Sequence, residues 1–528
     1  MKLHFPSACR CLLLAFCLHF QFNGLTQPAG TLDAMFDTDG IVTTSIGTAN
    51  AFATTMAIQA DGKLLLCGNS NNGTDNDFTI ARYLENGQPD QAFHMDGKVQ
   101  LDINGGDDFP EGIVVRPDNQ KIIVGGYSFN GNGFDFSLAQ FLPDGNPDLA
   151  FGNNGKAIEP IGTTAFAKGL ALQKDGKIVI AGYSSQGTNE FTLVRWLEDG
   201  SLDFDLDGDG IVTTPIGTNS ATASCLIIQP DDKILVAGQA FNDATFRWEA
   251  AIVRYNVDGS LDEAFDDDGI TIIANFNKDL FINAIALDHE GKIIAAGYTG
   301  TSPSNNQFAL MRFLPDGRPD SLFGTNGLLI TPVSNQNNQA NSILIQSDHK
   351  MIVGGTAEVN GADQFVLARY DREGSPDPTF GNDGKVSTPI GLIAGLNSML
   401  FDFTGRIVAS GASLNGTNFQ FAAARYLNDI QTQTYDDEIP ASGISIFPNP
   451  VQDAFDLAFL LHREEVLTIQ LFDARGNLLI SYLDRMKCQS GPFRRGFNIP
   501  ASLATGIYFI RVSSSSGQRS VPIVRLKP

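Results

Sequence analysis

Apolar and polar residues follow four successive patterns along this chain, and these patterns recur in a fixed order. Residues 40–46 form a half-polar run, and the next run alternates, with Met56 and Ile58 on one face. The third run is continuously apolar, as at 178–180, and the fourth, such as 78–84, is mixed. Alternation is typical of a strand with one packed face, and a continuous apolar run of a strand buried on both faces. With Asp-Gly hairpin turns between the second and third runs, the pattern predicts units of four antiparallel β-strands.

Seven copies of this unit follow one another at spacings of 55 to 59 residues. A Phe-x-x-x-Gly landmark begins at Phe36, Phe93, Phe151, Phe265, Phe323 and Phe380, with Leu206 in the remaining copy. A basic residue stands five positions before a Gly at Lys63, Lys121, Lys177, Lys233, Lys292, Lys350 and Arg406. An Arg precedes an aromatic residue at Arg82, Arg195, Arg254, Arg312, Arg369 and Arg425, with Gln140 as the exception. Self-similarity at a nearly constant spacing is typical of proteins built from one structural unit repeated along the chain.

Four-stranded units repeated seven times favour a radial propeller, with an open solenoid as the alternative. The residue before the third-strand Gly is always small, which predicts that another backbone lies close to it around a central axis (Cys67, Gly125, Ala181, Ala237, Ala296, Gly354 and Ser410). The chain enters with a spare first strand and leaves after a fourth strand. We therefore expect residues 40–46 to pair with the strand at 419–426 and to close the ring.

The repeat resembles the delta-60 family of secreted bacterial propeller repeats, in segments such as 380–386 and 365–370. The resemblance covers residues 31–428 and implies a seven-bladed β-propeller. The family has no defined biochemical role, so no active site is carried over from it.

After a polar linker at 429–442, residues 443–528 carry short alternating runs that predict a small Ig-like β-sandwich. This segment resembles the C-terminal sorting domain of the type IX secretion system of Bacteroidetes. The matching landmarks are Pro448, Asn449, Pro450, Gly476, Gly506 and Tyr508. The resemblance implies the type IX secretion machinery as a partner, export across the outer membrane, and often attachment to surface lipopolysaccharide. A carbohydrate-binding sandwich is the alternative reading.

Residues 1–26 have the parts of a secretory signal peptide: Lys2 and Arg10, then an apolar run from Cys11 to Phe20, then a polar exit with cleavage expected near Thr26. That run is too short for a stable membrane anchor, and no other segment predicts a transmembrane helix. The net charge is −24, and the acidic excess lies upstream of the basic C-terminal segment. Such a surface disfavours nucleic acid as a partner.

The spacing of the candidate residues predicts no catalytic group, no cofactor and no metal site. The histidines of the repeat region, His94, His289 and His349, fall at turn positions. The run Asp205, Asp207 and Asp209 begins like a calcium loop, but Ile216 stands where an EF-hand needs Glu, so a tight turn is favoured and calcium stays open. The cysteines that remain after signal removal are Cys67, Cys225 and Cys488, an odd number that disfavours a disulfide framework.

Each unit also carries an Asp after a Leu or Pro, as in Asp90, Asp203 and Asp377. We expect these carboxylates to pair with the repeated arginines as a structural framework, and Gln140 to replace the charged contact by a neutral hydrogen bond. A ligand clamp made by the arginines is the alternative.

Function is expected on the face whose connections vary in sequence, because variable loops on a rigid scaffold carry specificity. Exposed aromatic residues there are candidate ligand contacts: Phe109, Phe134, Phe241, Trp248 and Phe276. The favoured function is a cell-surface binding or interaction propeller for a glycan, a peptide or an envelope protein. The alternative is an extracellular lyase or hydrolase with its site in the central channel or on the variable face.

Overall fold

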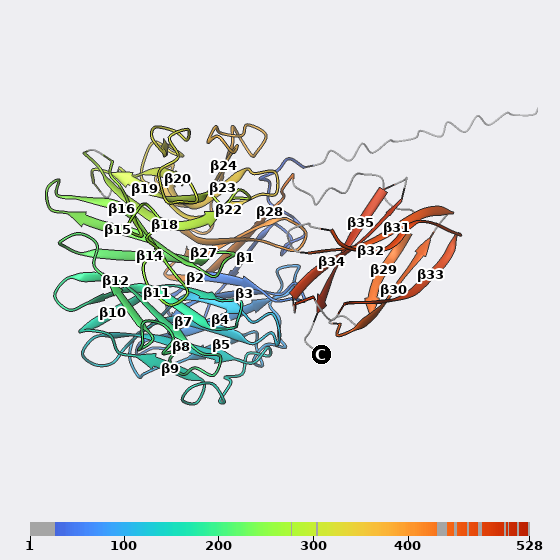
Figure 1. Ribbon diagram of the computed structural model, residues 1–528, viewed down its shortest axis with the longest axis horizontal. Helices are drawn as coiled ribbons and strands as arrows, with labels where there is room; N and C mark the ends of the chain where they lie inside the picture. Colours follow the sequence, from blue (N-terminus) through green and yellow to red (C-terminus); the bar gives the residue numbers. More distant parts are fainter. Residues whose placement is uncertain are drawn as a thin grey trace, which may run out of the picture.

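The computed structural model describes residues 27–275, 277–302, 305–429, 441–447, 451–461, 464–473, 478–500, 503–504, 506–514 and 517–525 (Figure 1). The predicted signal peptide 1–26, most of the linker, Phe276, Pro448, Asn449, Pro450 and Gly476 lie outside these residues. All regular elements in the described part are β-strands, and it contains no helix long and apolar enough to cross a membrane.

Seven sheets of four antiparallel strands form the ring. The inner strands, which contact their counterparts in both neighbouring sheets, are β2 (Ala51–Ile58), β6 (Asp108–Val115), β10 (Thr164–Leu172), β14 (Ala221–Ile228), β18 (Asp279–Leu287), β22 (Asn338–Ile345) and β26 (Ala394–Phe401). The second strands are β3 (Leu64–Asn71), β7 (Ile122–Phe129), β11 (Ile178–Ser185), β15 (Ile234–Asn242), β19 (Ile293–Gly300), β23 (Met351–Val359) and β27 (Ile407–Asn415). We call these sheets blades 1 to 7, in the order of their inner strands.

The third strands are β4 (Asn76–Tyr83), β8 (Phe134–Phe141), β12 (Asn189–Trp196), β16 (Arg247–Tyr255), β20 (Gln307–Phe313), β24 (Ala362–Tyr370) and β28 (Asn418–Tyr426). The outer strands are β5 (Lys98–Leu101), β9 (Lys156–Glu159), β13 (Ile211–Thr214), β17 (Ile270–Ile273), β21 (Leu328–Thr331), β25 (Lys385–Thr388) and, for blade 7, β1 (Ile41–Thr44). The predicted seven-bladed propeller is confirmed.

The N-terminal strand completes the last blade, as the split of the repeat predicted. Strand β1 pairs antiparallel with β28, so that Ile41 lies opposite Ala424 and Thr44 opposite Phe421. The paired segment is shorter than the predicted 40–46, because Gly40 ends the preceding turn with a φ of 89°.

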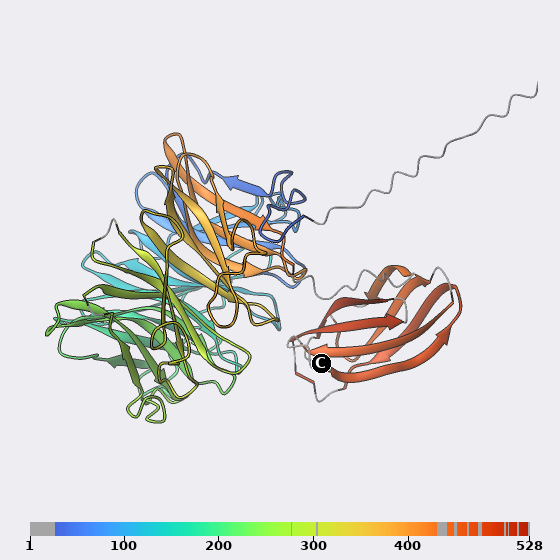
Figure 2. The same ribbon diagram turned by 90° about the horizontal axis from the view of Figure 1, so that it is seen from above.

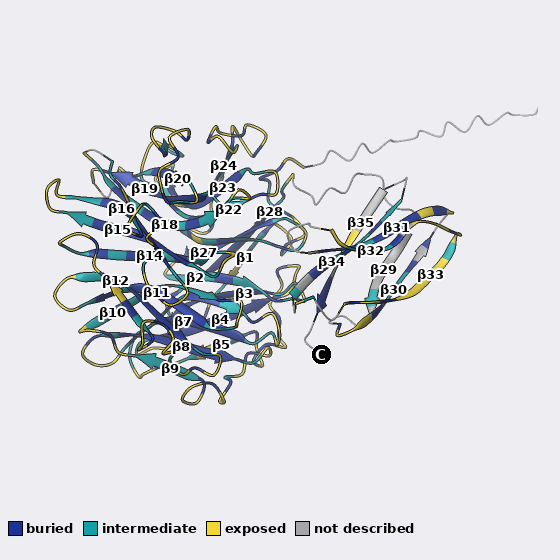
Figure 3. Cartoon of the chain, viewed as in Figure 1, coloured by how far each residue is buried: buried dark blue, intermediate teal, exposed yellow. Residues whose placement is uncertain are grey.

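The hydrophobic core is divided among the interfaces between adjacent blades. Seven buried clusters each combine residues of two neighbouring sheets, and the one that joins blade 7 to blade 1 contains Phe36, Val408 and Phe421. The landmark phenylalanines are at most 1% exposed, and Leu206 fills the same place in its copy with 0% exposure. Figure 3 shows these buried strands beside exposed connections.

The reason for the small residues in the second strands differs from the predicted one. The close backbone contact is at the Gly itself and comes from the same blade: a Cβ on Gly68 would lie 1.8 Å from Phe52 O, beside a β-bulge in β2. The preceding small residue instead faces a side chain of the next blade, since a Cβ on Gly354 would meet Met399 Sδ at 2.4 Å. The bulge, and not crowding of strands around the axis, requires the glycine.

The C-terminal strands form a sandwich of two sheets, seen as a separate unit in Figure 2. One sheet has the order β29 (Ala441–Phe447), β30 (Ala454–Leu461) and β33 (Gly491–Asn498). The other has the order β32 (Leu478–Cys488), β31 (Glu465–Asp473), β34 (Gly506–Ser514) and β35 (Gly517–Arg525). Leu457, Ile469 and Ile510 are buried between them. Of the sorting landmarks, Gly506 opens β34, and the buried Tyr508 donates a hydrogen bond of 2.7 Å from its hydroxyl to Ala504 O.

Candidate functional site

The repeated arginines pair with the repeated aspartates, so they form the predicted framework and no ligand clamp. The Arg Nε to Asp Oδ2 distances are 2.8 Å for Arg82–Asp90, 2.6 Å for Arg195–Asp203, 2.6 Å for Arg254–Asp262, 2.9 Å for Arg312–Asp320, 2.9 Å for Arg369–Asp377 and 2.8 Å for Arg425–Asp33. Gln140 Nε2 donates a neutral hydrogen bond of 2.7 Å to Asp148, as predicted. The basic residue of each second strand joins the same carboxylate, as Lys121 does at 2.7 Å.

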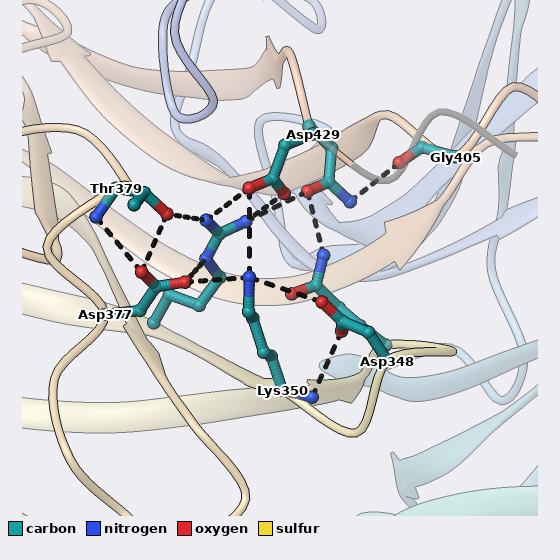
Figure 4. Close-up of polar contacts among 9 residues, drawn as sticks. Asp348, Lys350, Asp377, Thr379, Gly405 and Asp429 are labelled. Carbon is teal, nitrogen blue, oxygen red and sulfur yellow. Dashed lines mark hydrogen bonds and ion pairs between the residues drawn. The ribbon is translucent and has the colours of Figure 1, made fainter. Parts of the chain in front are cut away.

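The arginines also link successive blades. Arg82 Nη1 donates to Pro143 O of the next blade at 2.5 Å, and Arg254 Nη1 donates to Pro315 O at 2.6 Å. For Arg369 of blade 6, the Asp429 carboxylate takes the place of that carbonyl, with Arg369 Nη2 donating to Oδ2 at 2.7 Å (Figure 4). The chain therefore leaves the ring through a residue that completes its ion-pair network.

The antiparallel pairing places two kinds of connection on opposite faces of the ring. The turns between inner and second strands and those between third and outer strands share one face, which we call the repeated-turn face. The remaining connections form the variable-loop face. The candidate aromatic residues that the structure describes lie toward the variable-loop face, at the ends of strands: Phe109, Phe134, Phe241 and Trp248.

The expectation that these aromatic residues are exposed is wrong for the four that the structure describes. Phe109, Phe134, Phe241 and Trp248 are each half-buried, because their rings pack together across blade interfaces. In blades 2 and 3, the Phe109 ring centroid is 6.1 Å from that of Phe134, which is 5.3 Å from that of Phe166. Part of each ring is used to hold adjacent blades together.

An equivalent cluster joins blades 4 and 5. The Phe241 and Trp248 ring centroids are 5.4 Å apart, and Trp248 is 6.4 Å from Phe281, which stacks on Tyr298 at 4.7 Å. The same hairpin carries Phe246, whose side chain is 75% exposed. Sequence reasoning missed Phe246.

Phe246 has an unusual backbone. Its φ is 54°, in the left-handed region, where a bulky side chain is strained. The four-residue loops of the corresponding hairpins in blades 1 and 2 have a positive φ at their second residue, Gly73 at 104° and Gly131 at 94°, whereas this loop has it at its last residue. An aromatic residue in a loop whose counterparts in blades 1 and 2 contain only Asn, Gly, Thr and Asp is the signal that could have revealed it.

Fixed polar side chains surround this hairpin. Asp243 accepts hydrogen bonds from Thr218 Oγ1 at 2.8 Å and from Asn219 Nδ2 at 2.7 Å, and so joins two variable loops. Asn242 Nδ2 donates to Glu249 Oε1 at 2.9 Å. The aromatic rings therefore lie beside carboxylates and amides that are already oriented. We call Phe241, Phe246 and Trp248, with these polar residues, the blade-4 site.

The inner strands carry a second polar group, Glu111 and Lys168, which form an ion pair between blades 2 and 3. The Lys168 ammonium lies 5.2 Å from the centroid of the Tyr127 ring. Burial raises the pKa of Tyr127 to about 12, despite the opposing effect of Lys168. A catalytic base needs a pKa closer to the working pH, so this group suits blade-to-blade contact better than acid–base chemistry.

The histidines and the acidic run singled out in the sequence lie in turns, whereas Cys67 lies in β3. His94 and His349 have φ values of 40° and 69°, and His289 stacks edge-on against His349 with ring centroids 4.8 Å apart. Asp205, Asp207 and Asp209 are exposed in the turn before β13, and Asp209 accepts a hydrogen bond from Ile211 N at 2.9 Å. Burial raises the pKa of the Cys67 thiol, which matches a packing residue in a blade interface.

The framework coincides with the segments that match a known repeat. Residues 59–93, 118–151, 173–203, 229–265, 291–323 and 346–380 match the domain of unknown function (DUF5122) beta-propeller. Residues 445–524 match the secretion system C-terminal sorting domain. The chain contains DUF5122 β-propeller repeats and a C-terminal sorting domain. The sorting domain marks this DUF5122 propeller for export by type IX secretion to the cell surface or the extracellular space.

Comparison with curated proteins found no match for the DUF5122 propeller. Among solved structures, it is similar to PorZ, a surface component of the type IX secretion system of Porphyromonas gingivalis, with 13% identity over 92% of this chain and a TM-score of 0.39. The chain spans 61% of the length of PorZ. It is also similar to a PL25 ulvan lyase, with 10% identity, a TM-score of 0.46, and 72% of this chain and 97% of the lyase covered. A protein of unknown function from Dyadobacter fermentans has 11% identity, a TM-score of 0.41, and coverage of 73% and 97%. With TM-scores below 0.5, these likenesses support no inference about function.

Proposed function

We propose that the DUF5122 propeller is a surface-displayed binding protein whose ligand is a glycan held at the blade-4 site. The observation that carries this proposal is Phe246, an aromatic side chain that is 75% exposed and has a strained backbone beside Phe241 and Trp248. Strained non-glycine residues cost on the order of 1–3 kcal/mol and concentrate at functional sites. Exposure of this apolar ring to water also costs free energy, and a ligand that covers the ring would recover part of that free energy.

The neighbouring polar groups favour a glycan over other ligands. A sugar ring presents apolar C–H groups on one side, which pack on aromatic rings, and hydroxyl groups at its edges. Binding sites usually combine an aromatic lining with a few oriented polar groups. Asp243 and Asn242 supply such groups, with Asn242 oriented by the buried Glu249, and the acidic surface of the propeller disfavours a polyanionic ligand. Surface lipopolysaccharide, as the anchor implied by the sorting domain, stays a prediction.

A glycan array tests the proposal. The mature chain, from residue 27 to 528, is expected to bind a subset of neutral glycans, and Phe246→Ala should lose most of that signal. Phe204→Ala is the matched control, because Phe204 is 66% exposed on the repeated-turn face and should keep full binding. No glycan binding, or equal binding by the Phe246→Ala variant, would refute the assignment. Binding of peptides and not of glycans would show that the blade-4 site is a peptide-binding site.

The enzyme alternative has less support. The described inner strands offer Glu111 and Lys168 as an ion pair, and the tyrosines beside them have raised pKa values. Burial is the main cause for both Tyr127 and Tyr183, and it makes their ionisation harder. Depolymerisation of any array-positive glycan by the purified chain would favour the enzyme.

A further inference from the structure

Three aspartates from blades 1 and 2 converge on the variable-loop face. They are Asp77 of β4, Asp102 in the connection after β5, and Asp108 of β6. One carboxylate oxygen from each lies within 4.8 Å of one from each of the others. Oxygens on opposite sides of a calcium ion, each at 2.3–2.6 Å from it, are about 4.6–5.2 Å apart, so all three can reach one ion.

Two of these carboxylates are buried and have an oxygen without a donor. Asp108 is fully buried and Asp77 is 4% exposed. Asp108 Oδ2 accepts from Ile103 N at 2.6 Å and Asp77 Oδ2 accepts from Asn72 Nδ2 at 2.9 Å, whereas neither Oδ1 has a hydrogen-bond partner. Ser128 lies opposite Asp108 in the sheet, and its hydroxyl donates a hydrogen bond of 2.7 Å to Ser137 Oγ. A buried carboxylate oxygen without a donor costs free energy unless a cation meets it.

The fold does not require a carboxylate at position 108. Asp108 lies opposite Ser128, and the same register in other blades places Ala51 opposite Ser70 and Ala394 opposite Ser413. Alanine therefore fills this place where no charge is present. Burial raises the pKa of Asp108 to about 7, with a smaller increase from the charges of Asp102 and Asp77, while the Ile103 N–H and the nearby Ser128 hydroxyl lower it.

Lys156 does not neutralise the cluster directly. Its ammonium donates to the carbonyl oxygens of Asp102 at 2.6 Å and of Ile103 at 3.1 Å. The connection that carries Asp102 is thereby held in place, and Asp102 Oδ1 accepts from Gly105 N at 2.6 Å. Asp102 itself is exposed, which leaves a path for an ion and for water ligands from solvent.

We propose that Asp77, Asp102 and Asp108 bind a calcium ion that fastens the first two blades at the variable-loop face. Three carboxylates with water completing the shell suit calcium, which accepts irregular oxygen sites, better than magnesium, which demands octahedral geometry. The affinity expected of such a site is that of extracellular modules, with Kd on the order of 10⁻⁴–10⁻³ M. This inference is independent of glycan binding.

Thermal unfolding of the chelator-treated mature chain tests the site. Addition of 5 mM calcium chloride at pH 8 should raise the Tm by about 1–3 °C, because the ion binds only the folded state. Asp108→Asn keeps an acceptor for Ile103 N but removes the charge, so its Tm should not respond to calcium. Without calcium, this variant should melt above the wild type, since it lacks the uncompensated carboxylate.

Two further variants separate the site from general effects. Asp135→Asn is the matched control, because Asp135 occupies the position of Asp77 in blade 2 and accepts from Asn130 at 2.8 Å; it should keep the full calcium response. Asp102 is exposed, so the Asp102→Asn substitution should leave the fold intact. Titration calorimetry should show that this variant binds calcium at least about tenfold more weakly than the wild type. No calcium heat in the wild type, or the same response in wild type and both Asp108→Asn and Asp102→Asn, would overturn the proposal.

Discussion

Arg116 Nε donates a hydrogen bond of 3.2 Å to Gln140 Oε1, which reverses an arrangement found in the neighbouring blade. In blade 1, the arginine is on the third strand, where Arg82 Nη1 donates to Gln59 Oε1 at 3.0 Å. Blade 2 has exchanged the two residue types between the two positions. The exception in the arginine series is thus compensated, and the arginine still reaches the next blade through Gly176 O at 3.0 Å.

This exchange predicts a strong coupling between positions 116 and 140. Gln140→Arg alone brings two buried guanidinium groups together, and Arg116→Gln alone removes a buried donor, so each should lower the free energy of unfolding by about 1–3 kcal/mol. The double variant restores the arrangement of blade 1. In urea unfolding, the free energy of unfolding of the double variant should be at least about 1 kcal/mol higher than the sum of the two single-variant effects predicts. Simple additivity would show that the two side chains act separately.

The ion pair, the number of blades and the closing strand could be predicted from sequence because each depends on a pattern repeated in every unit. The aromatic candidates could not, because exposure is decided by rings from two blades meeting, as Phe134 meets Phe166. Phe246 and Asp108 are deviations confined to one blade. The role of Phe246 depends on the conformation of its hairpin, and the role of Asp108 depends on neighbours that only the closed ring brings together. Neither can be derived from a repeat pattern in the sequence.

Phe380 should be essential for stability. It is 0% exposed, and the Arg369 guanidinium lies 4.8 Å from its ring centroid. Phe380→Ala is expected to cost about 3–5 kcal/mol, measured by urea unfolding. Phe204→Ala should change the same quantity by less than about 0.5 kcal/mol. A cost near that of the control would mean that the landmark ring contributes little to the core.

The framework predicts loss of stability in acid. Burial alone would raise the pKa of Asp377, but hydrogen bonds from Thr379 and the Lys350 and Arg369 cations outweigh it and lower the pKa to about 2. The unfolded value is about 3.9, so this carboxylate contributes stability above pH 4 that is lost as the pH falls toward 2. The Tm should fall across that window, and less steeply in Asp377→Asn. A Tm that stays level from pH 4 to 2 would contradict this account.

Two truncations distinguish the sorting domain from the last residue of the ring. Removal of residues 440–528 should leave the propeller Tm within about 2 °C, since domains joined by few contacts unfold independently. Removal of residues 428–528 also takes Asp429 from Arg369, which keeps its ion pair with Asp377, and should cost about 1–3 kcal/mol. In the native host, the shorter deletion should retain the protein in the periplasm, as immunoblots of cell fractions would show. Surface display without residues 440–528 would contradict the sorting role.

The most direct measurement of the central claim is the dissociation constant for the strongest glycan found on the array, determined by titration calorimetry. Trp248→Phe should weaken binding by about tenfold and Phe246→Ala by at least as much, because the bound sugar loses aromatic surface. Phe204→Ala should leave the constant unchanged. If all three variants bind that glycan as tightly as the wild type, the blade-4 site is not where the propeller binds its ligand.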